Sequence, residues 1–156
     1  IGGGLSSFLY VGPLLAFVLI LIGVTNPLNL LIAFVSLFLF AFGVSGMSIT
    51  IAVALKSSDR FDIFMGVFDA LIVRLSTAMY PYAFVQQANP IYASIVNINP
   101  LTFASDLFRW GTGPEGLFSY LTSQQIAILG LVMFFSIFSF FSIVFYEKRL
   151  EGGGWE

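Results

Sequence analysis

The side chains that could do chemistry in this chain are carboxylates, guanidiniums, amines, amides and hydroxyls, because the sequence contains no histidine and no cysteine. Histidine is the usual general base near neutral pH and a common zinc ligand. Cysteine would be needed for a disulfide framework or for thiol chemistry. No pair of acids is spaced for catalysis either. An enzyme is therefore the least expected class, and no metal site is predicted.

The most specific group of polar residues is the sequence Asn-Pro-Leu-Thr-Phe over residues 99–103, followed by Asp106 and Arg109. Pro100 suits the first turn of a helix, where its missing N–H costs nothing. Asn99 can cap that helix by accepting from backbone N–H groups. Asp106 and Arg109 are three residues apart and can pair on one face. Taken alone, the pattern favours a capped interfacial helix with a surface ion pair.

Two further charges, Asp69 and Arg74, fall inside a hydrophobic stretch. A charge within a membrane costs about 2.5–3.5 kcal/mol on insertion scales and normally faces a partner or a water-filled cavity. Five residues correspond to about 140° of helix rotation, so these two are poorly placed to pair with each other. Asp69 shares a helix face with Asp62 and Ser76 instead. Two interpretations stay open: a polar stripe along a translocation path, or a contact that holds helices or subunits together.

The elements that must position these residues are membrane-spanning helices. No charged side chain occurs among residues 1–55, and one crossing takes about 20 apolar residues. This stretch is therefore long enough for two crossings, with a polar turn at Thr25–Asn29 between them. Hydropathy predicts four spans in all, over residues 5–23, 28–55, 63–80 and 125–146. We predict an all-α integral membrane fold that forms one transmembrane domain over residues 1–156.

Residues 81–123 form an unusual connection between the third and fourth predicted spans. Four prolines interrupt it, yet it is too apolar for an ordinary solvated loop. Irregular backbone at membrane depth is tolerated only against protein or a water-filled cavity. We therefore expect short helices that lie at the outer leaflet or dip into it as re-entrant segments.

The basic residues predict the orientation of the chain in the plasma membrane, because they favour the cytoplasmic side of short loops. Lys56 and Arg60 lie between the second and third spans, and Lys148 and Arg149 follow the fourth. The long connection before the fourth span contains only Arg109. We expect that connection outside the cell, and the N- and C-termini of this chain in the cytoplasm.

Composition separates this chain from soluble proteins. Charged residues make up 9% of it and hydrophobic residues 58%, whereas soluble proteins carry about 25% charged residues. The net charge of −2 comes without a basic patch, so no nucleic-acid partner is expected. The expected environment is a lipid bilayer. Because the chain begins at Ile-Gly-Gly-Gly close to a span, we expect it to be a fragment of a longer protein.

The order of motifs and spans resembles that of one family of membrane proteins. A span ends in Leu-Ser-Thr-Ala-Met-Tyr-Pro over residues 75–81, Asn-Pro-Leu-Thr-Phe follows with an acid and an arginine, and a final span ends in Glu-Lys-Arg. This order resembles the permease family of type-2 ABC transporters, which export drugs, lipids and polysaccharides. The family pattern is Leu-Ser-Gly-x-x-Phe-Pro and then Asn-Pro-Leu-Thr-Tyr. Thr77 and Phe103 depart from that pattern.

The resemblance implies a six-span permease of which this chain holds the last four spans. Such a permease works as a homodimer or heterodimer with ATP-binding cassette subunits, which would bind ATP and Mg, so this chain would hold no cofactor. It would export a hydrophobic or amphipathic substrate. The family motif would form an extracellular gate, contributed by Asn99, Pro100, Thr102, Asp106 and Arg109.

Two alternatives to this interpretation remain open. The loop with Lys56 and Arg60 is a candidate contact with the cassette subunit, or its charges serve only to set the topology. The chain as a whole is an exporter permease, or it is a non-transporting membrane anchor or scaffold subunit of a larger complex. An adjacent gene for an ATP-binding cassette would favour transport.

Overall fold

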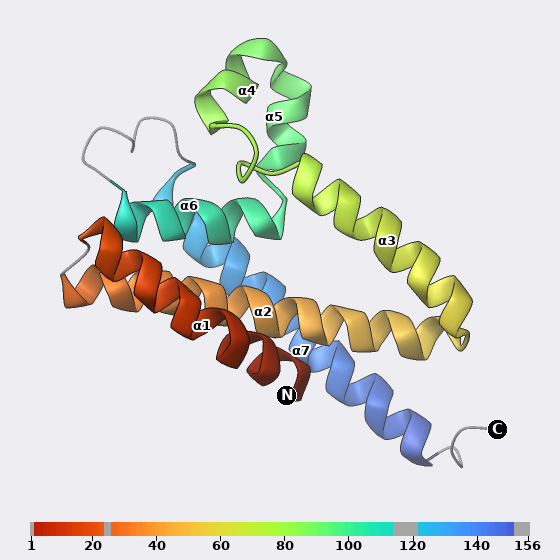
Figure 1. The fold of residues 1–156 in the computed structure, drawn as a ribbon. Coiled ribbons are helices and arrows are strands. Elements are labelled where there is room, and N and C mark those ends of the chain that lie inside the picture. Colours follow the sequence, from red (N-terminus) through yellow and green to blue (C-terminus); the bar gives the residue numbers. More distant parts are fainter. Residues whose placement is uncertain (1, 24–25, 114–121, 152–156) are drawn as a thin grey trace.

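The computed structural model describes residues 2–23, 26–113 and 122–151, and every regular element within them is a helix (Figure 1). The helices are α1 (Gly2–Ile22), α2 (Pro27–Leu55), α3 (Ser58–Arg74), α4 (Tyr82–Ala88), α5 (Pro90–Val96), α6 (Pro100–Thr112) and α7 (Gln124–Glu151). The predicted all-α fold is confirmed over these ranges. Thr25 of the predicted turn, and part of the predicted outer connection, lie outside the described residues.

Three helices are long and apolar enough to cross a membrane. They contain the stretches Gly4–Ile22, Pro27–Leu55 and Gln124–Lys148. The spans predicted at residues 5–23, 28–55 and 125–146 match them to within a few residues. Large apolar side chains such as Leu9, Ile20 and Phe140 are mostly exposed on these helices. Three such helices indicate a protein embedded in a membrane.

The predicted span at residues 63–80 has different bounds and a different character in the structure. α3 begins at Ser58 and ends at Arg74, and residues 75–81 form turns. Its 17 residues rise about 25 Å, which is less than the roughly 30 Å of a hydrocarbon core. Five of its side chains are charged. For these reasons α3 does not belong with the three long apolar helices.

Both ends of α2 have conformations typical of helix ends. Asn26 caps α2 by accepting from the backbone N–H of Leu28 at 3.0 Å, and Pro27 stands in the first turn. At the other end Lys56 adopts a left-handed backbone with φ 53°, a conformation common at helix ends. α3 begins two residues later, so Arg60 lies in its first turn rather than in the predicted loop.

The bundle is built around the contact between α2 and α7, the most extensive in the structure. A Cβ atom at Gly46 would lie 2.8 Å from the carbonyl oxygen of Phe138, closer than two such atoms pack. A small residue is therefore required where the two helices cross. α1 packs antiparallel along α2 (Figure 1), with the ring of Phe8 against the rings of Phe34 and Phe38 at 6.1 and 5.9 Å between centroids.

α6 lies across α2 and α7 and closes one end of the bundle (Figure 1). Phe103 and Leu107 on α6 are buried against Ala127 and Leu131 on α7. Gly130 makes room for the ring of Phe103, which a Cβ atom at that position would overlap. α6 is therefore a packed part of the core, and the site described below rests on it.

The remaining helices lie outside this core. α4 and α5 pack on each other through Val85, Ala93 and Val96. α3 leans away from α2 (Figure 1), and none of its residues is buried in this chain. The short helices predicted between the third and fourth spans are thus present as α4, α5 and α6.

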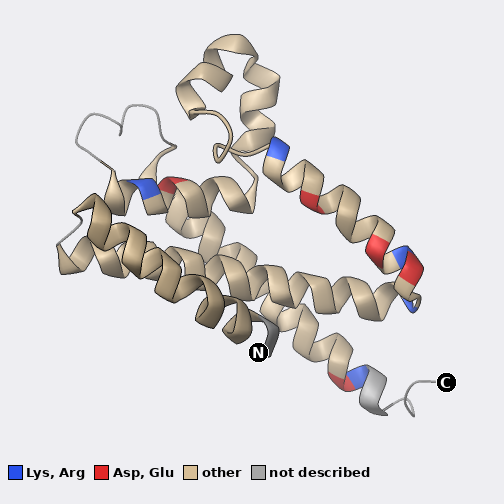
Figure 2. Ribbon diagram, viewed as in Figure 1, with Lys and Arg blue, Asp and Glu red and all other residues tan. Residues whose placement is uncertain are grey.

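Apart from Asp69 and Arg74 on α3, the charged residues that the structure describes gather toward two ends of the molecule (Figure 2). One group contains Lys56 and Arg60 at the junction of α2 with α3, and Lys148 near the end of α7 lies toward the same end. The other group is the pair on α6, Asp106 and Arg109. The two long helices α2 and α7 run between these ends in the same direction, whereas α1 and α3 run back (Figure 1).

Candidate functional site

The turn after α3 lies against the first half of α6, which brings together two polar segments that are far apart in the sequence. The backbone N–H of Thr77 donates to Thr102 Oγ1 at 3.2 Å, and Thr77 Oγ1 lies 2.9 Å from Ser105 Oγ. Thr77 and Thr102 are fully buried. Side-chain hydrogen bonds therefore fix this turn to α6.

Asn99 begins α6 and also ties it to the end of α3. Its Oδ1 accepts from the backbone N–H of Leu101 at 2.9 Å, and Pro100 occupies the first turn, as the sequence predicts. Its Nδ2 donates to the carbonyl oxygens of Ile72 at 2.7 Å and Leu75 at 2.6 Å. Carbonyls at the end of a helix lack partners within that helix. One amide side chain thus satisfies the ends of two helices.

Asp106 is fully buried and joins three segments. Its Oδ1 accepts from Thr77 Oγ1 at 2.6 Å, and its Oδ2 accepts from the hydroxyl and the backbone N–H of Thr122 at 2.8 and 2.9 Å. Thr122 lies just before α7. The carboxylate therefore links the turn after α3, α6 itself and the start of α7. A buried charge loses its hydration and is destabilising unless it is hydrogen-bonded. These three donors replace the lost water.

Arg109 makes the predicted pair with Asp106, but the pair is long. Arg109 Nη1 lies 3.4 Å from Asp106 Oδ1, whereas a charge-assisted hydrogen bond measures about 2.7–2.9 Å. The same Nη1 donates to the carbonyl oxygen of Thr77 at 2.6 Å, and Nη2 donates to that of Ala78 at 3.3 Å. The side chain of Arg109 is 33% exposed. Arg109 mainly braces the carbonyls of the turn after α3.

These residues form one connected set, which we call the Asp106 network: Thr77, Asn99, Thr102, Asp106, Arg109 and Thr122. Both carboxylate oxygens of Asp106 accept hydrogen bonds from within the chain. Among the described residues, no group of three or more His, Cys, Asp or Glu is placed to hold a metal ion. The hydrogen bonds of the network hold the helices together.

The predicted intramembrane charges are not part of this network. Asp69 and Arg74 are both exposed on α3, and the one ion pair among the described residues is that of Asp106 with Arg109. Ser76 lies beyond the end of α3, so it does not continue the face that carries Asp69. Its hydroxyl donates to the carbonyl oxygen of Val73 at 2.8 Å and accepts from the N–H of Ala78. Ser76 shapes the turn.

Lys56 and Arg60, the candidate contact with a cassette subunit, lie together at the junction of α2 and α3. Both side chains are exposed. Asp59 and Asp62 stand beside Arg60 in the first turns of α3. The surface there carries both signs of charge and lies at the opposite end of the bundle from the Asp106 network (Figure 2).

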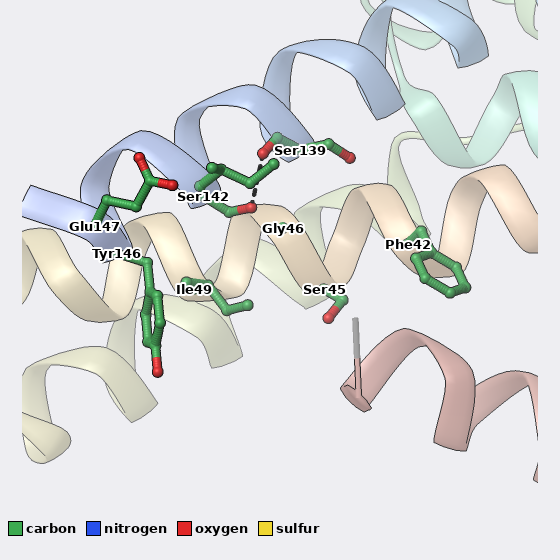
Figure 3. Close-up of a pocket in the computed structure, with 9 residues that line it drawn as sticks. Phe42, Ser45, Gly46, Ile49, Ser139, Ser142, Tyr146 and Glu147 are labelled. Atoms are coloured by element: carbon green, nitrogen blue, oxygen red, sulfur yellow. Dashed lines mark hydrogen bonds between the residues drawn. The ribbon is translucent and has the colours of Figure 1, made fainter. Parts of the chain in front are cut away.

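A pocket of about 490 Å³ lies between α2 and α7 (Figure 3), and none of its lining residues belongs to the Asp106 network. Tyr146 and Glu147 stand at one end and Phe42 at the other (Figure 3). Hydroxyls from Ser45 and Ser142 interrupt a mostly apolar lining, and Ser142 donates to the carbonyl oxygen of Ser139 at 2.9 Å. The pocket combines an apolar interior with a polar end.

Sequence reasoning missed the two threonines that hold Asp106. Thr77 attracted notice only as a departure from a glycine in the family pattern, and Thr122 attracted none. The useful indication was the aspartate itself. A carboxylate on the apolar side of a short helix needs donors, and Ser and Thr hydroxyls flanking neighbouring helices are the donors that such an apolar chain can supply.

Comparison with protein-family models, with curated proteins and with solved structures finds no match to this chain.

Proposed function

We propose that this chain is the C-terminal, four-span part of the permease subunit of a type-2 ABC exporter. The observation that supports this most directly is the contact between residues 75–81 and residues 99–109. These two segments carry the family resemblance from separate parts of the sequence, and the structure joins them through the Asp106 network. A motif whose parts meet in space is better explained by a shared role than by chance.

In the proposed mechanism, the permease dimerises and two ATP-binding cassette subunits supply ATP hydrolysis with Mg. Closure of the cassettes moves the permease helices and opens a path for a hydrophobic or amphipathic substrate. The Asp106 network holds α6 to α3 and α7 at the extracellular end. It would keep the outer gate closed until those helices move. The partly apolar pocket between α2 and α7 suits a substrate of this kind.

We propose α3 as a further crossing in the assembled protein, the third of four in this chain. It runs antiparallel to α2 (Figure 1) and exposes Ile63, Phe64 and Val67. The turn after α3 adds length beyond its last helical residue. In the assembled protein, Asp69 and Arg74 would face either a water-filled path or polar groups of the missing spans or of a second permease.

In the proposed orientation, the protein lies in the plasma membrane and both termini of this chain are in the cytoplasm. It is supported by the position of Lys56, Arg60 and Lys148 toward one end of the bundle (Figure 2). Basic residues are retained on the cytoplasmic side. The exposed Lys56 and Arg60 would then be accessible to a cassette subunit. α4, α5 and α6 would lie at the outer leaflet.

The test is an affinity purification of the full-length protein in mild detergent, followed by an ATPase assay. We expect a cassette subunit to co-purify and to hydrolyse ATP. Two variants locate the contact. The double variant Lys56→Glu/Arg60→Glu should lose the cassette subunit, whereas the control variant Lys148→Glu should keep it. A protein that purifies without a cassette, or with a partner that lacks ATPase activity, would favour the membrane anchor or scaffold.

A further inference from the structure

We propose that a groove between α2 and α6 binds one phospholipid with an anionic head group, and that Arg109 holds its phosphate. This proposal concerns a resident lipid and does not depend on transport. The groove has a volume of about 480 Å³ and is open on one side, within the range of sites for small molecules. We call it the Arg109 groove. It is lined in part by Leu37, Phe40, Leu101, Ser105, Phe108 and Arg109.

The charge of Arg109 is only partly neutralised within the chain. Its one acidic partner, Asp106, lies 3.4 Å away, and that carboxylate takes three shorter hydrogen bonds from Thr77 and Thr122. A guanidinium has more N–H donors than the three contacts that Arg109 makes. With a side chain that is 33% exposed, Arg109 offers its remaining donors to the groove. A guanidinium with donors to spare can bind a phosphate through charge-assisted hydrogen bonds.

The two walls of the groove match the two parts of a lipid. On α6, Ser105, Arg109 and Thr112 follow at helical spacing and give a polar side. On α2, Leu37 and Phe40 face them with apolar surface, against which an acyl chain can lie. A phosphate accepts from a guanidinium in the planar geometry that Arg presents best. Because the groove is open on one side, the rest of the lipid can extend into the bilayer.

A second groove on the opposite side of α6 shows why Arg109 decides the type of ligand. That groove has a volume of about 300 Å³ and is lined mainly by aliphatic residues such as Leu31, Val35 and Ile128. It contains no charged side chain, so it has no feature that would select a head group. The Arg109 groove contains one cation. The phosphate is common to both kinds of lipid, but a zwitterionic head group would bring a second cation close to Arg109, so an anionic lipid is favoured.

The test uses the full-length protein in mixed micelles that contain equal amounts of phosphatidylglycerol and phosphatidylcholine. Retained lipids are counted by native mass spectrometry, without ATP. We expect one phosphatidylglycerol to be retained in preference to phosphatidylcholine. Arg109→Gln should weaken its retention about tenfold, the effect of one charge-assisted hydrogen bond. Arg74→Gln removes an exposed cation outside the groove and should change nothing.

A second variant keeps the test decisive if Arg109→Gln does not fold. Leu37→Trp fills the apolar wall of the groove from α2, on which no member of the Asp106 network lies, so it should also release the lipid. Leu28→Trp, at an exposed position on the same helix, is its control. Inorganic phosphate at millimolar concentration should not displace the lipid, whereas displacement would mean that the site takes phosphate alone. Equal retention of the two lipids, or wild-type retention in Leu37→Trp, would overturn the proposal.

Discussion

Asp69 and Arg74 on α3 and Asp106 and Arg109 on α6 are two sets of opposite charges, and the two sets have opposite environments. Asp106 is fully buried, accepts three short hydrogen bonds and lies 3.4 Å from Arg109. Asp69 and Arg74 are both exposed, and they form no ion pair within the described residues. The spacing of three on α6 permits a contact on one face, and the spacing of five on α3 does not.

The comparison teaches that spacing alone does not make a buried charge stable. Asp106 is held chiefly by the hydroxyls of Thr77 and Thr122, and Arg109 contributes the longest of its contacts. Those threonines come from outside α6. Among the described residues, no hydroxyl from another segment bonds to the carboxylate of Asp69 or the guanidinium of Arg74, and no residue of α3 is buried. Asp69 and Arg74 therefore stay exposed within the part of the chain that the structure describes.

The largest expected effect comes from removing the buried carboxylate. Asp106→Ala leaves the hydroxyls of Thr77 and Thr122 without an acceptor and Arg109 without its acid. Breaking such a buried set costs about 3–5 kcal/mol. We expect the free energy of unfolding, measured by denaturant titration in detergent, to fall by that amount.

The same substitution on α3 is the matched control. Asp69→Ala removes an exposed carboxylate with no ion pair, so the free energy of unfolding of this chain should change by less than about 0.5 kcal/mol. Equal losses for Asp106→Ala and Asp69→Ala would break the distinction drawn between the two helices.

A smaller effect is expected at the junction of α3 with α6. Asn99→Ala removes the cap of α6 and the two hydrogen bonds to the end of α3, and should cost about 2 kcal/mol. Asn89 caps α5 in the same way but makes no such bonds, so Asn89→Ala should cost about 1 kcal/mol. Thermal unfolding of both variants gives the difference, and identical costs would mean that the ties to Ile72 and Leu75 contribute nothing.

The contribution of the Thr77 hydroxyl to holding Asp106 can be separated from that of Arg109. Thr77→Val keeps the shape of the side chain but removes the donor to Asp106 Oδ1, and should cost about 1–2 kcal/mol. Thr50 donates only to the carbonyl of Gly46 within its own helix, so Thr50→Val should cost less than about 0.5 kcal/mol. Both are measured by denaturant titration. A neutral Thr77→Val would mean that Thr122 and Arg109 hold Asp106 without help from the Thr77 hydroxyl.

Much of the fold could be predicted from local patterns. Long uncharged stretches gave the bounds of α1, α2 and α7 to within a few residues, because the length of a crossing is set by the bilayer. The start of α6 followed from Asn99 and Pro100, whose chemistry is that of a helix beginning. The contact between Asp106 and Arg109 followed from their spacing.

Features that depend on distant segments could not be predicted in this way. Hydropathy extended the third span to residue 80, but the chain turns after Arg74, where Ser76 bonds to Val73 and the carbonyls of α3 bond to Asn99. The burial of Asp106 could not be seen from α6 alone, because its donors follow α3 and precede α7. The prediction that Ser76 shares a helix face with Asp69 is wrong for the same reason, because α3 ends at Arg74.

The smallest expected effect tests whether spacing is what separates the charges of α3. The double variant Asp69→Ala/Ala70→Asp moves the acid to a position four residues before Arg74. This spacing allows an ion pair on one helix face. Ala70 is exposed, so the change adds no crowding. We expect the double variant to be more stable than Asp69→Ala alone by about 0.3–0.5 kcal/mol in detergent, since exposed pairs on helices contribute this much.

High salt provides the control for this last variant, because it screens an exposed pair and should remove the gain. The contact of Asp106 with Arg109 rests on buried hydrogen bonds, so the stability of the unchanged protein should respond less to salt. A gain that persists at high salt would arise from helix propensity rather than from the pair. No gain at all would mean that the position of Arg74 at the end of α3, and not its spacing from Asp69, keeps the two charges apart.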